Sequence, residues 1–269
     1  MGFDRYTLIL GAVQGLTEFL PISSSGHLAL LQMFFDFRSS GLLAFDLILH
    51  CATTLAVLIF FRNDVVRLLT QWLRGFTGSE ARASEGWTTG WAILAGTVAT
   101  GVLALPLKGL VETAMRSYIA VGAGLLTTAG LLCIVPLLPK RNRALSIRVA
   151  VLVGIAQGLA VFPGVSRSGT TIMAALALGL AAPDAFRLSF LMSIPAIMGA
   201  SLMEYLKVLR TSVVLPDGWL LSAAVAFLLG CLSLALLRRL VLSGKWAYFG
   251  IYCFLLGVFA IMSEIVTAF

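Results

Sequence analysis

Residues 11–27, GAVQGLTEFLPISSSGH, return in altered form 143 residues later as GIAQGLAVFPGVSRSGT at residues 154–170. Each copy has a short apolar stretch, a Pro or Pro-Gly break, a serine-rich loop closed by Gly, and a second apolar stretch, which indicates an internal repeat. The first loop holds Glu18 and His27, and the second holds Arg167. If the loops meet, they bring a carboxylate, an imidazole, a guanidinium and several hydroxyls together. Eight of the seventeen positions are identical without a gap, namely Gly11/Gly154, Gln14/Gln157, Gly15/Gly158, Leu16/Leu159, Phe19/Phe162, Ser23/Ser166, Ser25/Ser168 and Gly26/Gly169.

The composition predicts an all-α integral membrane protein. Hydrophobic residues make up 59% of the chain and charged residues 12%, with a mean hydropathy of +1.00, whereas about a quarter of the residues of a soluble domain are charged. The formal net charge is +7, but the basic residues lie in short loops between apolar segments. They are explained by membrane topology and anionic lipid rather than by nucleic acid. The four cysteines lie in apolar runs without paired spacing, so we expect buried, reduced thiols rather than a zinc site or disulfides.

Six apolar segments are long enough to cross the membrane, since a spanning helix needs about 20 residues. They cover residues 41–61, 87–106, 118–138, 184–206, 219–237 and 246–266. Four shorter segments flank the repeated loops, at residues 6–20, 24–35, 146–162 and 169–181. Each flanking pair therefore predicts a re-entrant helical hairpin that enters the membrane, breaks at the loop and returns, with its broken backbone buried in protein or lining a watery cavity.

The segment count predicts two inverted repeats, residues 1–140 and residues 141–269, within one membrane domain. Each half has one re-entrant hairpin followed by three crossings, and an odd number of crossings inverts the second half relative to the first. Twelve lysines and arginines fall on one side of this arrangement and six on the other. The side with twelve, which includes the long loop 62–86, is expected in the cytoplasm. The mixed charges of that loop suggest a partly ordered surface segment.

Glu18 follows Gln14 by four residues, so both side chains lie on one helical face. A carboxylate and an amide in this position could coordinate a hard divalent cation that brings phosphate with it; the alternative is that Glu18 bonds the broken backbone of the hairpin. Asp46 and His50 have the same spacing and could pair with each other. This structural role would account for both residues, so they are weaker candidates for the site than the loop residues.

The two serine-rich loops predict an anion site. Hydroxyls and free N–H groups at the start of a helix bind anions, although serines there can equally cap the helix. Arg167 adds a guanidinium suited to phosphate oxygens. His27 beside three hydroxyls could transfer a proton or attack, or it could serve as a structural hydrogen-bonding group. Ser24 with His27 as base, His27 itself, and water all remain candidate nucleophiles.

The two motifs together, QGLTEFLPISSSGH and PGVSRSGTT, resemble the paired signature of the bacterial undecaprenyl-diphosphate phosphatase family, of the bacitracin-resistance type. The resemblance implies a multi-pass enzyme of the bacterial inner membrane, with its active site facing the periplasm. It implies hydrolysis of undecaprenyl diphosphate to the monophosphate, which recycles the lipid carrier for cell-wall synthesis, with a divalent cation, Mg or Ca, as cofactor. Carried over residue by residue, it implies Gln14 and Glu18 as the acidic motif, Ser23, Ser24, Ser25 and His27 as the first loop, and Ser166, Arg167, Ser168 and Thr171 as the second. Within these motifs we predict Ser24, His27 and Glu18 as catalytic groups and Glu18 also as metal ligand. The residues predicted at the substrate are Arg167, Ser23, Ser25, Ser166, Ser168, Thr171 and Gln14.

One departure from the family pattern concerns the metal. The first position of the family's (Glu/Gln)-x-x-x-Glu motif is Gln14 here, so Glu18 is its one carboxylate. The expected partners are undecaprenyl diphosphate and membrane lipid, without nucleic acid, and a homodimer is left open. A different function class also fits inverted repeats with broken helices, namely a secondary transporter or flippase of a phosphorylated lipid.

Overall fold

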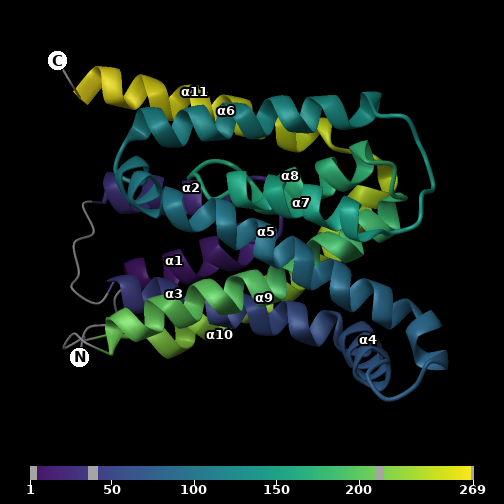
Figure 1. Cartoon of the computed structure of the whole chain (residues 1–269). Helices are drawn as coiled ribbons and strands as arrows, with labels where there is room; N and C mark the ends of the chain where they lie inside the picture. The colour runs from purple at the N-terminus through teal and green to yellow at the C-terminus, as the bar shows by residue number, and fades with distance from the viewer. Residues whose placement is uncertain (1–4, 36–41, 210–214, 268–269) are drawn as a thin grey trace.

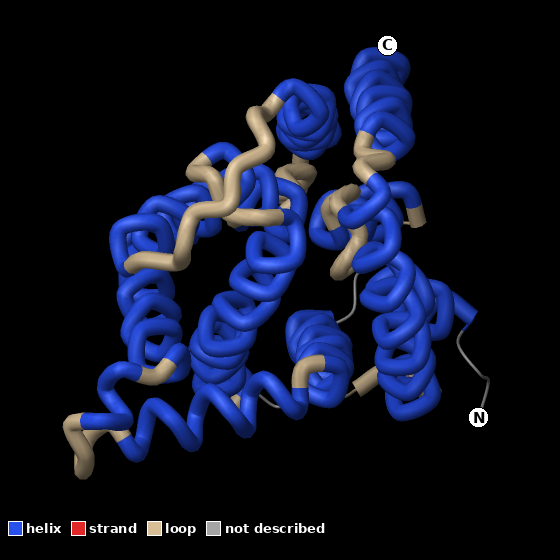
Figure 2. The backbone as a smooth tube through the Cα atoms, turned by 90° about the vertical axis from the view of Figure 1, so that its right-hand side faces the viewer, coloured by secondary structure: helices blue, strands red, loops and turns tan. Residues whose placement is uncertain are grey.

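The computed structural model describes residues 5–35, 42–209 and 215–267, and the regular structure within these ranges is helical without strands (Figure 1, Figure 2). This confirms the predicted all-α class. The helices are α1 (Arg5–Thr17), α2 (Ser24–Phe34), α3 (Leu42–Phe60), α4 (Arg62–Arg74), α5 (Glu85–Ala114), α6 (Tyr118–Ile134), α7 (Ile147–Leu159), α8 (Arg167–Ala177), α9 (Ala182–Val208), α10 (Trp219–Ser243) and α11 (Ala247–Thr267), with short 3-10 helices η1 (Glu80–Ala83) and η2 (Val135–Leu137).

The predicted crossings correspond to long apolar helices. Five described helices are long and apolar enough to span a membrane, namely α5, α6 continued by η2, α9, α10 and α11. The sixth predicted crossing corresponds to α3, which has 19 residues and meets α4 at a bend of 77°. Position 41, where that crossing was expected to begin, lies outside the described residues.

The four helices beside the repeated loops are short and matched in length. Helices α1 and α7 have 13 residues each, and α2 and α8 have 11 each. At about 1.5 Å per residue, a helix of this length covers about 20 Å or less of the roughly 30 Å of hydrocarbon. Each of the four is therefore too short to cross the membrane alone, which agrees with the predicted re-entrant hairpins.

Glycines of the repeat let two helix pairs pack backbone to backbone. A Cβ added at Gly11 of α1 would lie 2.5 Å from the carbonyl oxygen of Ser222 on α10. Gly154 of α7 is the equivalent residue of the second repeat, and a Cβ added there would meet the carbonyl oxygen of Gly96 on α5 at least as closely. Small residues at such contacts are typical of membrane helix pairs. The division into residues 1–140 and 141–269, and the inversion of one half, stay predictions that these matched contacts favour.

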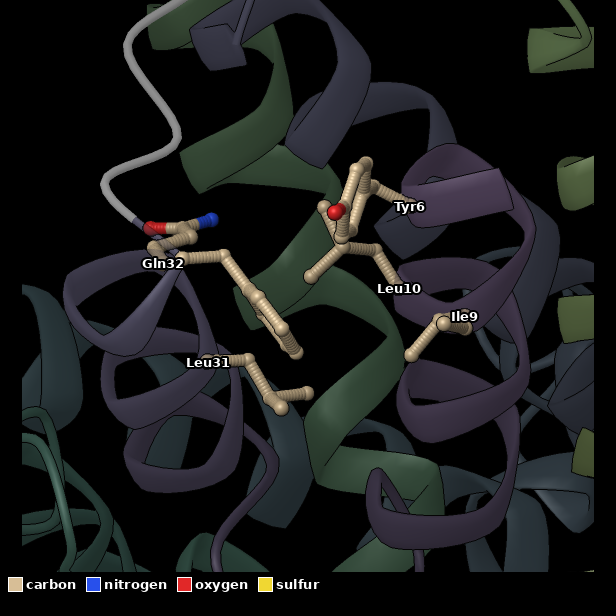
Figure 3. Close-up of a pocket in the computed structure, with 6 residues that line it drawn as sticks. Tyr6, Ile9, Leu10, Leu31 and Gln32 are labelled. Atoms are coloured by element: carbon tan, nitrogen blue, oxygen red, sulfur yellow. The ribbon is translucent and has the colours of Figure 1, made fainter. Parts of the chain in front are cut away.

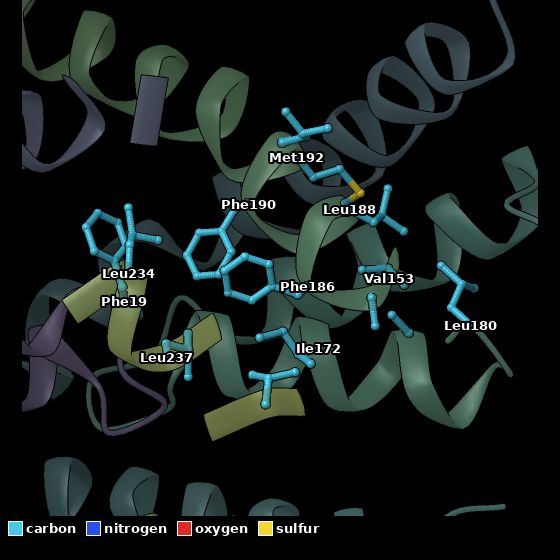
Figure 4. Packing of buried hydrophobic residues seen from close by; sticks show 14 of the residues in the cluster. Phe19, Val153, Ile172, Leu180, Phe186, Leu188, Phe190, Met192, Leu234 and Leu237 are labelled. Atoms are coloured by element: carbon cyan, nitrogen blue, oxygen red, sulfur yellow. The ribbon is translucent and has the colours of Figure 1, made fainter. Parts of the chain in front are cut away.

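The core lies between the hairpin loops and the long helices α9 and α10 (Figure 4). Phe19, at the end of α1, packs against Phe190 of α9 with ring centroids 5.7 Å apart, and Phe190 packs against Phe186 at 4.8 Å. Leu234 and Leu237 of α10 are fully buried beside them. This apolar packing fixes the end of α1 and one face of α9, which both border the candidate site.

Helix α4 corrects the prediction for loop 62–86. Residues 62–74 form a regular helix rather than a partly ordered segment. Ion pairs attach it to the long helices, because Arg187 of α9 bonds both Asp64 of α4 (2.8 Å) and Glu85 of α5, and Arg67 of α4 bonds the same two carboxylates at 2.9 and 3.1 Å. The mixed charges that suggested a loop are therefore paired.

The cysteines are free thiols, but they are not all buried as expected. Cys253 is buried, Cys231 is half-buried, and Cys51 and Cys133 are exposed. An apolar run in a membrane helix can face lipid as well as the core, so hydrophobic surroundings in sequence do not establish burial in the fold.

Candidate active site

The two serine-rich loops contact each other. The hydroxyl of Ser23 donates to the backbone carbonyl of Val165 at 3.4 Å. A Cβ added at Gly26 would lie 2.9 Å from the Cα atom of Gly164, so the two backbones touch. The fold therefore brings together the two stretches that the repeat singled out.

Four of the predicted serines are engaged in building the loops. The hydroxyls of Ser23 and Ser166 accept hydrogen bonds from the N–H group three residues further on, at 3.3 and 3.1 Å, and so cap α2 and α8. Ser25 and Ser168 lie 3.3 and 3.2 Å from these capping hydroxyls. Helix capping, the structural alternative for these loops, thus accounts for part of the serine content. Ser24 is the hydroxyl of the first loop that is directed elsewhere.

The turn before α2 directs Ser24 toward Glu18. Ser23 has a φ of 68°, a left-handed conformation found at no other non-glycine residue in the described ranges. Such a conformation costs on the order of 1–3 kcal/mol and persists where the surroundings enforce it. The hydroxyl of Ser24 donates to Glu18 Oε2 at 2.6 Å. A short hydrogen bond to a carboxylate is the strong, charge-assisted kind.

Glu18 is the residue on which the site converges. Its side chain, at the end of α1, is 4% exposed. The amide of Gln14 donates to Oε2 at 3.0 Å, and His50 Nε2 lies 3.9 Å from the same oxygen. Arg167 lies 3.6 Å from Oε1. A carboxylate removed from water is costly unless it is paired, and these contacts supply the pairing.

Ser24 and Arg167 hold equivalent positions in the repeat. They are the first residues of α2 and α8, and both side chains reach Glu18. The two loops therefore meet at Glu18. The position equivalent to Glu18 is Val161, so the second repeat contributes a guanidinium to the site of the first and has no matching carboxylate of its own.

A pocket opens beside Glu18 and Arg167. Arg167 is 32% exposed, and its guanidinium carries five N–H donors, so it can bind a ligand while it remains near Glu18. The pocket lining combines two charged side chains, three serine hydroxyls and three apolar side chains. The lining residues are Glu18, Phe19, Arg167, Ser168, Ser189, Phe190, Ser193 and Ile197.

His27 is turned away from Glu18. Its Nδ1 lies 2.7 Å from the backbone carbonyl of Ser23 and its Nε2 lies 2.7 Å from the hydroxyl of Tyr252 on α11. Because a carbonyl can only accept, Nδ1 carries a proton, and in the neutral ring Nε2 accepts from Tyr252. Both ring nitrogens of His27 are thus engaged.

Thr171 lies beneath the site rather than in the pocket. It is fully buried, its hydroxyl donates to the carbonyl of Arg167 at 2.8 Å, and the same hydroxyl lies 2.6 Å from that of Ser189 on α9. Thr171 therefore connects the start of α8 to the α9 wall of the pocket. Thr171 would therefore influence a bound ligand indirectly, by holding Arg167 and Ser189 in place.

Residues 7–259 match the family model described as bacitracin resistance protein BacA. The chain belongs to this family. Proteins named undecaprenyl-diphosphatase in Korarchaeum cryptofilum, Methanosphaera stadtmanae and Desulfosudis oleivorans are 41%, 38% and 41% identical to it. The alignments cover 95%, 96% and 93% of this chain and 97%, 97% and 94% of those proteins. The resemblance predicted from the two loops is thereby confirmed.

In this BacA family member, part of the site fits a divalent cation. The amide oxygen of Gln14 is buried without a hydrogen-bond partner among the described residues, and it belongs to the side chain that bonds Glu18. Amide and carboxylate oxygens are suitable ligands for Mg²⁺ or Ca²⁺. No group of three His, Cys, Asp or Glu side chains that could hold a metal occurs in the described ranges. A cation here would need oxygen ligands from substrate or water.

The pairing expected between Asp46 and His50 does not form through their side chains. The carboxylate of Asp46 accepts from Gln32 at 3.2 Å, and His50 Nδ1 lies 2.9 Å from the backbone carbonyl of Asp46. This bond turns His50 Nε2 toward Glu18. The sequence offered no signal for this contact, because it depends on how α3 packs against α1.

Ser189 and Ser193 line the pocket but were missed in the sequence. They are four residues apart on α9 and therefore share a helical face. Two hydroxyls at this spacing inside an apolar helix are a signal that could have found them.

A second pocket lies near the start of α1, between α1 and α2 (Figure 3). Its walls are mostly apolar, and Gln32, its amide-bearing residue, is occupied with Asp46. The lining residues are Tyr6, Ile9, Leu10, Leu31, Gln32 and Phe35. It contains no carboxylate, imidazole or guanidinium and does not resemble the site at Glu18.

Proposed function

We propose that this protein is a membrane-embedded phosphatase that hydrolyses undecaprenyl diphosphate to undecaprenyl phosphate and inorganic phosphate. The observation that carries the proposal is the hydrogen bond of 2.6 Å from Ser24 to Glu18 beside Arg167. A hydroxyl, a base and a guanidinium in contact are the groups that phosphoryl transfer needs. The names of the relatives support the same substrate.

The diphosphate would bind at the charged side chains of the pocket. Arg167 would contact its oxygens, and the helices α2 and α8 both begin at this point, where backbone N–H groups and the helix dipole favour an anion. Phe19, Phe190 and Ile197 would face the prenyl chain. This composition of the pocket suits a ligand with a charged head and a hydrocarbon tail.

Ser24 would attack the terminal phosphorus. Glu18 takes the hydroxyl proton as the Ser24 Oγ–P bond forms, and the bridging P–O bond breaks to release undecaprenyl phosphate. A water molecule then attacks the phosphoserine, the O–P bond to Ser24 breaks as Glu18 returns its proton to Ser24 Oγ, and inorganic phosphate leaves as H₂PO₄⁻ with both protons of the water. Arg167 stabilises the negative charge on the phosphoryl oxygens in both steps.

Among the three nucleophiles that the sequence left open, Ser24 is the one we favour. His27 would have to give up its bond to Ser23 or to Tyr252 before it could attack. Direct attack by water activated by Glu18 remains the second route. For His27 we propose a positioning role, since it connects the start of α2 to α11.

A divalent cation, Mg or Ca, would be held by Glu18 and the buried amide oxygen of Gln14, together with oxygens of the substrate. When bound, it would neutralise charge on the diphosphate and make the phosphorus more electrophilic. Arg167 contributes charge of the same sign from the second loop.

We further propose that the chain resides in a bacterial inner membrane with the site open to the periplasm. The twelve-to-six distribution of basic residues supports this orientation. Each group assigned to the site comes from a single chain, so the proposal does not require the homodimer that the sequence left open.

Purified protein in detergent should release phosphate from undecaprenyl diphosphate, and Glu18→Gln should lower the rate at least about a hundredfold, within the usual range for a general base. Asp46→Asn is a matched control, because Asp46 is also an acidic residue within an apolar segment but bonds Gln32. Binding of the lipid without phosphate release would favour the transporter alternative instead.

A further inference from the structure

Helix α4 runs nearly at right angles to the crossing that precedes it. The bend between α3 and α4 is 77°. Helix α3 is apolar apart from Asp46 and His50, which face the protein interior, whereas α4 has Arg62, Asp64, Arg67 and Arg74 among its 13 residues. Four charges in this length are incompatible with a lipid-exposed span. With α3 crossing the membrane, α4 must lie close to the membrane plane.

The surface of α4 divides into three sides. One side packs on the protein, where Leu68 is 5% exposed. The next side is apolar and largely exposed, although Phe76 at its end packs against Trp87 of α5 with ring centroids 5.2 Å apart. At about 100° per residue, its apolar members fall within an arc of roughly 80°, which Arg62, the first residue of the helix, also shares. The apolar members are Val66 (64% exposed), Leu69 (50%), Leu73 (53%) and Phe76 (53%), the last just beyond the end of the helix.

The third side is polar. Asn63, Arg67 and Arg74 are exposed there, next to the apolar arc and away from the core. A helix with protein, hydrocarbon and water on three successive sides is the arrangement of an interfacial helix.

Aromatic residues extend the apolar arc toward α5. Trp72 lies 5.2 Å from Phe76 and 5.8 Å from Trp91, and Trp87 lies 5.7 Å from Trp91, measured between ring centroids. Tryptophan is enriched at the level of the lipid head groups, where its ring is apolar and its N–H is polar. The cluster places the start of α5 at the same depth in the membrane as α4.

After the ion pairs around α4 are counted, positively charged side chains in the described part of the chain remain unpaired. Asp64 and Glu85 are both neutralised by Arg67 and Arg187. In contrast, Arg62, Arg74 and Arg82 make no ion pair among the described residues, and the bonds of Arg62 and Arg82 go to backbone carbonyls. The exposed carboxylate of Glu80 offsets one of these three guanidinium groups, and the remaining positive excess beside the apolar arc complements an anionic phospholipid surface.

We propose that α4 is a docking site for anionic phospholipid. Val66, Leu69, Leu73 and Phe76 enter the boundary between head groups and acyl chains, and Arg62, Arg74 and Arg82 bind the phosphate groups. Because Arg187 connects α4 to α9, whose Ser189 and Phe190 line the pocket, this site also fixes the height of α9 in the membrane. The inference rests on α4 alone and holds whether or not the proposed chemistry is correct.

Photo-crosslinking tests the proposal on the full chain. A benzophenone amino acid replaces Leu73 in one variant and Asn63, on the polar side of the same helix, in the matched control. Each protein is reconstituted into vesicles with equal amounts of phosphatidylglycerol and phosphatidylcholine, irradiated, and analysed by mass spectrometry. A third protein combines the label at position 73 with Arg62→Gln, Arg74→Gln and Arg82→Gln.

Position 73 should attach to lipid several-fold more often than position 63, and phosphatidylglycerol should exceed phosphatidylcholine several-fold among its adducts. The three glutamines should bring that ratio close to one while adducts still form. Equal labelling at positions 63 and 73, attachment of position 73 to a second copy of the chain, or an even lipid ratio with the arginines intact would each overturn the proposal.

Discussion

Two side chains that contact Glu18 come from equivalent positions of the two repeats. Ser24 and Arg167 each begin a helix after a capping serine, and one supplies a hydroxyl while the other supplies a guanidinium. The second repeat has lost the carboxylate, since Val161 stands at the position of Glu18. The two halves therefore contribute different chemistry to one site, in which Glu18 is the shared contact.

Arg167→Lys keeps the charge but removes the planar fork that can bind two phosphate oxygens at once. Phosphate release should fall at least about tenfold, which corresponds to about 1.4 kcal/mol of transition-state stabilisation, while the melting temperature in detergent stays near that of the unaltered protein. Near-normal turnover in the lysine variant would mean that Arg167 acts only as a positive charge.

His50 should act as a positioning residue for Glu18. His50→Gln provides an amide donor in place of the imidazole and should retain activity within about threefold. His50→Leu removes a polar contact of 3.9 Å, which is longer than a hydrogen bond; at about 1 kcal/mol, its loss should lower kcat about fivefold with little change in KM. The comparison of kcat and KM for both variants checks this, and equal losses in both variants would contradict a positioning role.

The candidate site residues could be predicted because they lie in the repeated loops, but their contacts could not. Gln14 and Glu18 follow from helical spacing. The contact of His50 with Glu18 depends on the packing of two helices, and an apparent partner, Asp46, lay four residues away. The direction of His27 depends on Tyr252, which lies 225 residues further along the chain.

At the level of helices, the hydropathy pattern predicted both the long crossings and the short arms, because segment length alone separates them. The pattern was insufficient for α4. Its charged residues suggested a loop, since Arg187, a partner of Asp64, lies far outside residues 62–86. The repeated glycines at positions 11 and 154 were visible, but only the fold shows that they face α10 and α5.

Gly11→Val should destabilise the protein because the added side chain would meet the backbone of Ser222 on α10. Overpacking of this kind costs about 1–3 kcal/mol, so the melting temperature in detergent should fall by several degrees. Gly130→Val is the matched control, since a Cβ at Gly130 of α6 meets nothing within 4 Å. A Gly11→Val variant as stable as the control would show that α1 and α10 can separate at no cost.

Apart from the contacts at Glu18, the ion pairs among the described residues form two groups. Arg67, Arg187 and their partners form one group, and Lys108 and Lys207 share Glu204 in another, at 3.1 and 3.5 Å. The sequence had assigned these basic residues to opposite membrane sides in the same two groups. The two groups of ion pairs therefore agree with the predicted division of the basic residues between two membrane sides. Which of the two sides is cytoplasmic stays a prediction.

Labelling of intact cells with a membrane-impermeant maleimide tests the orientation. Thr113→Cys, near the Lys108 cluster, should react in intact cells, whereas Ser79→Cys, near α4, should react only after permeabilisation. The unaltered chain measures the background of the native cysteines. The reverse pattern would place the long loop outside and contradict the charge asymmetry.

The most direct test of the account is to trap the phosphorylated enzyme. Protein is mixed with undecaprenyl diphosphate labelled in its terminal phosphate and quenched within one turnover, one half in acid, which preserves phosphoserine, and the other in alkaline detergent, which preserves phosphohistidine. Both halves are digested and mapped. The account predicts label on Ser24, with none in Ser24→Ala and normal labelling in Ser25→Ala, the neighbouring hydroxyl. Label on His27, or turnover by the wild-type enzyme without any phosphoenzyme, would contradict attack by Ser24.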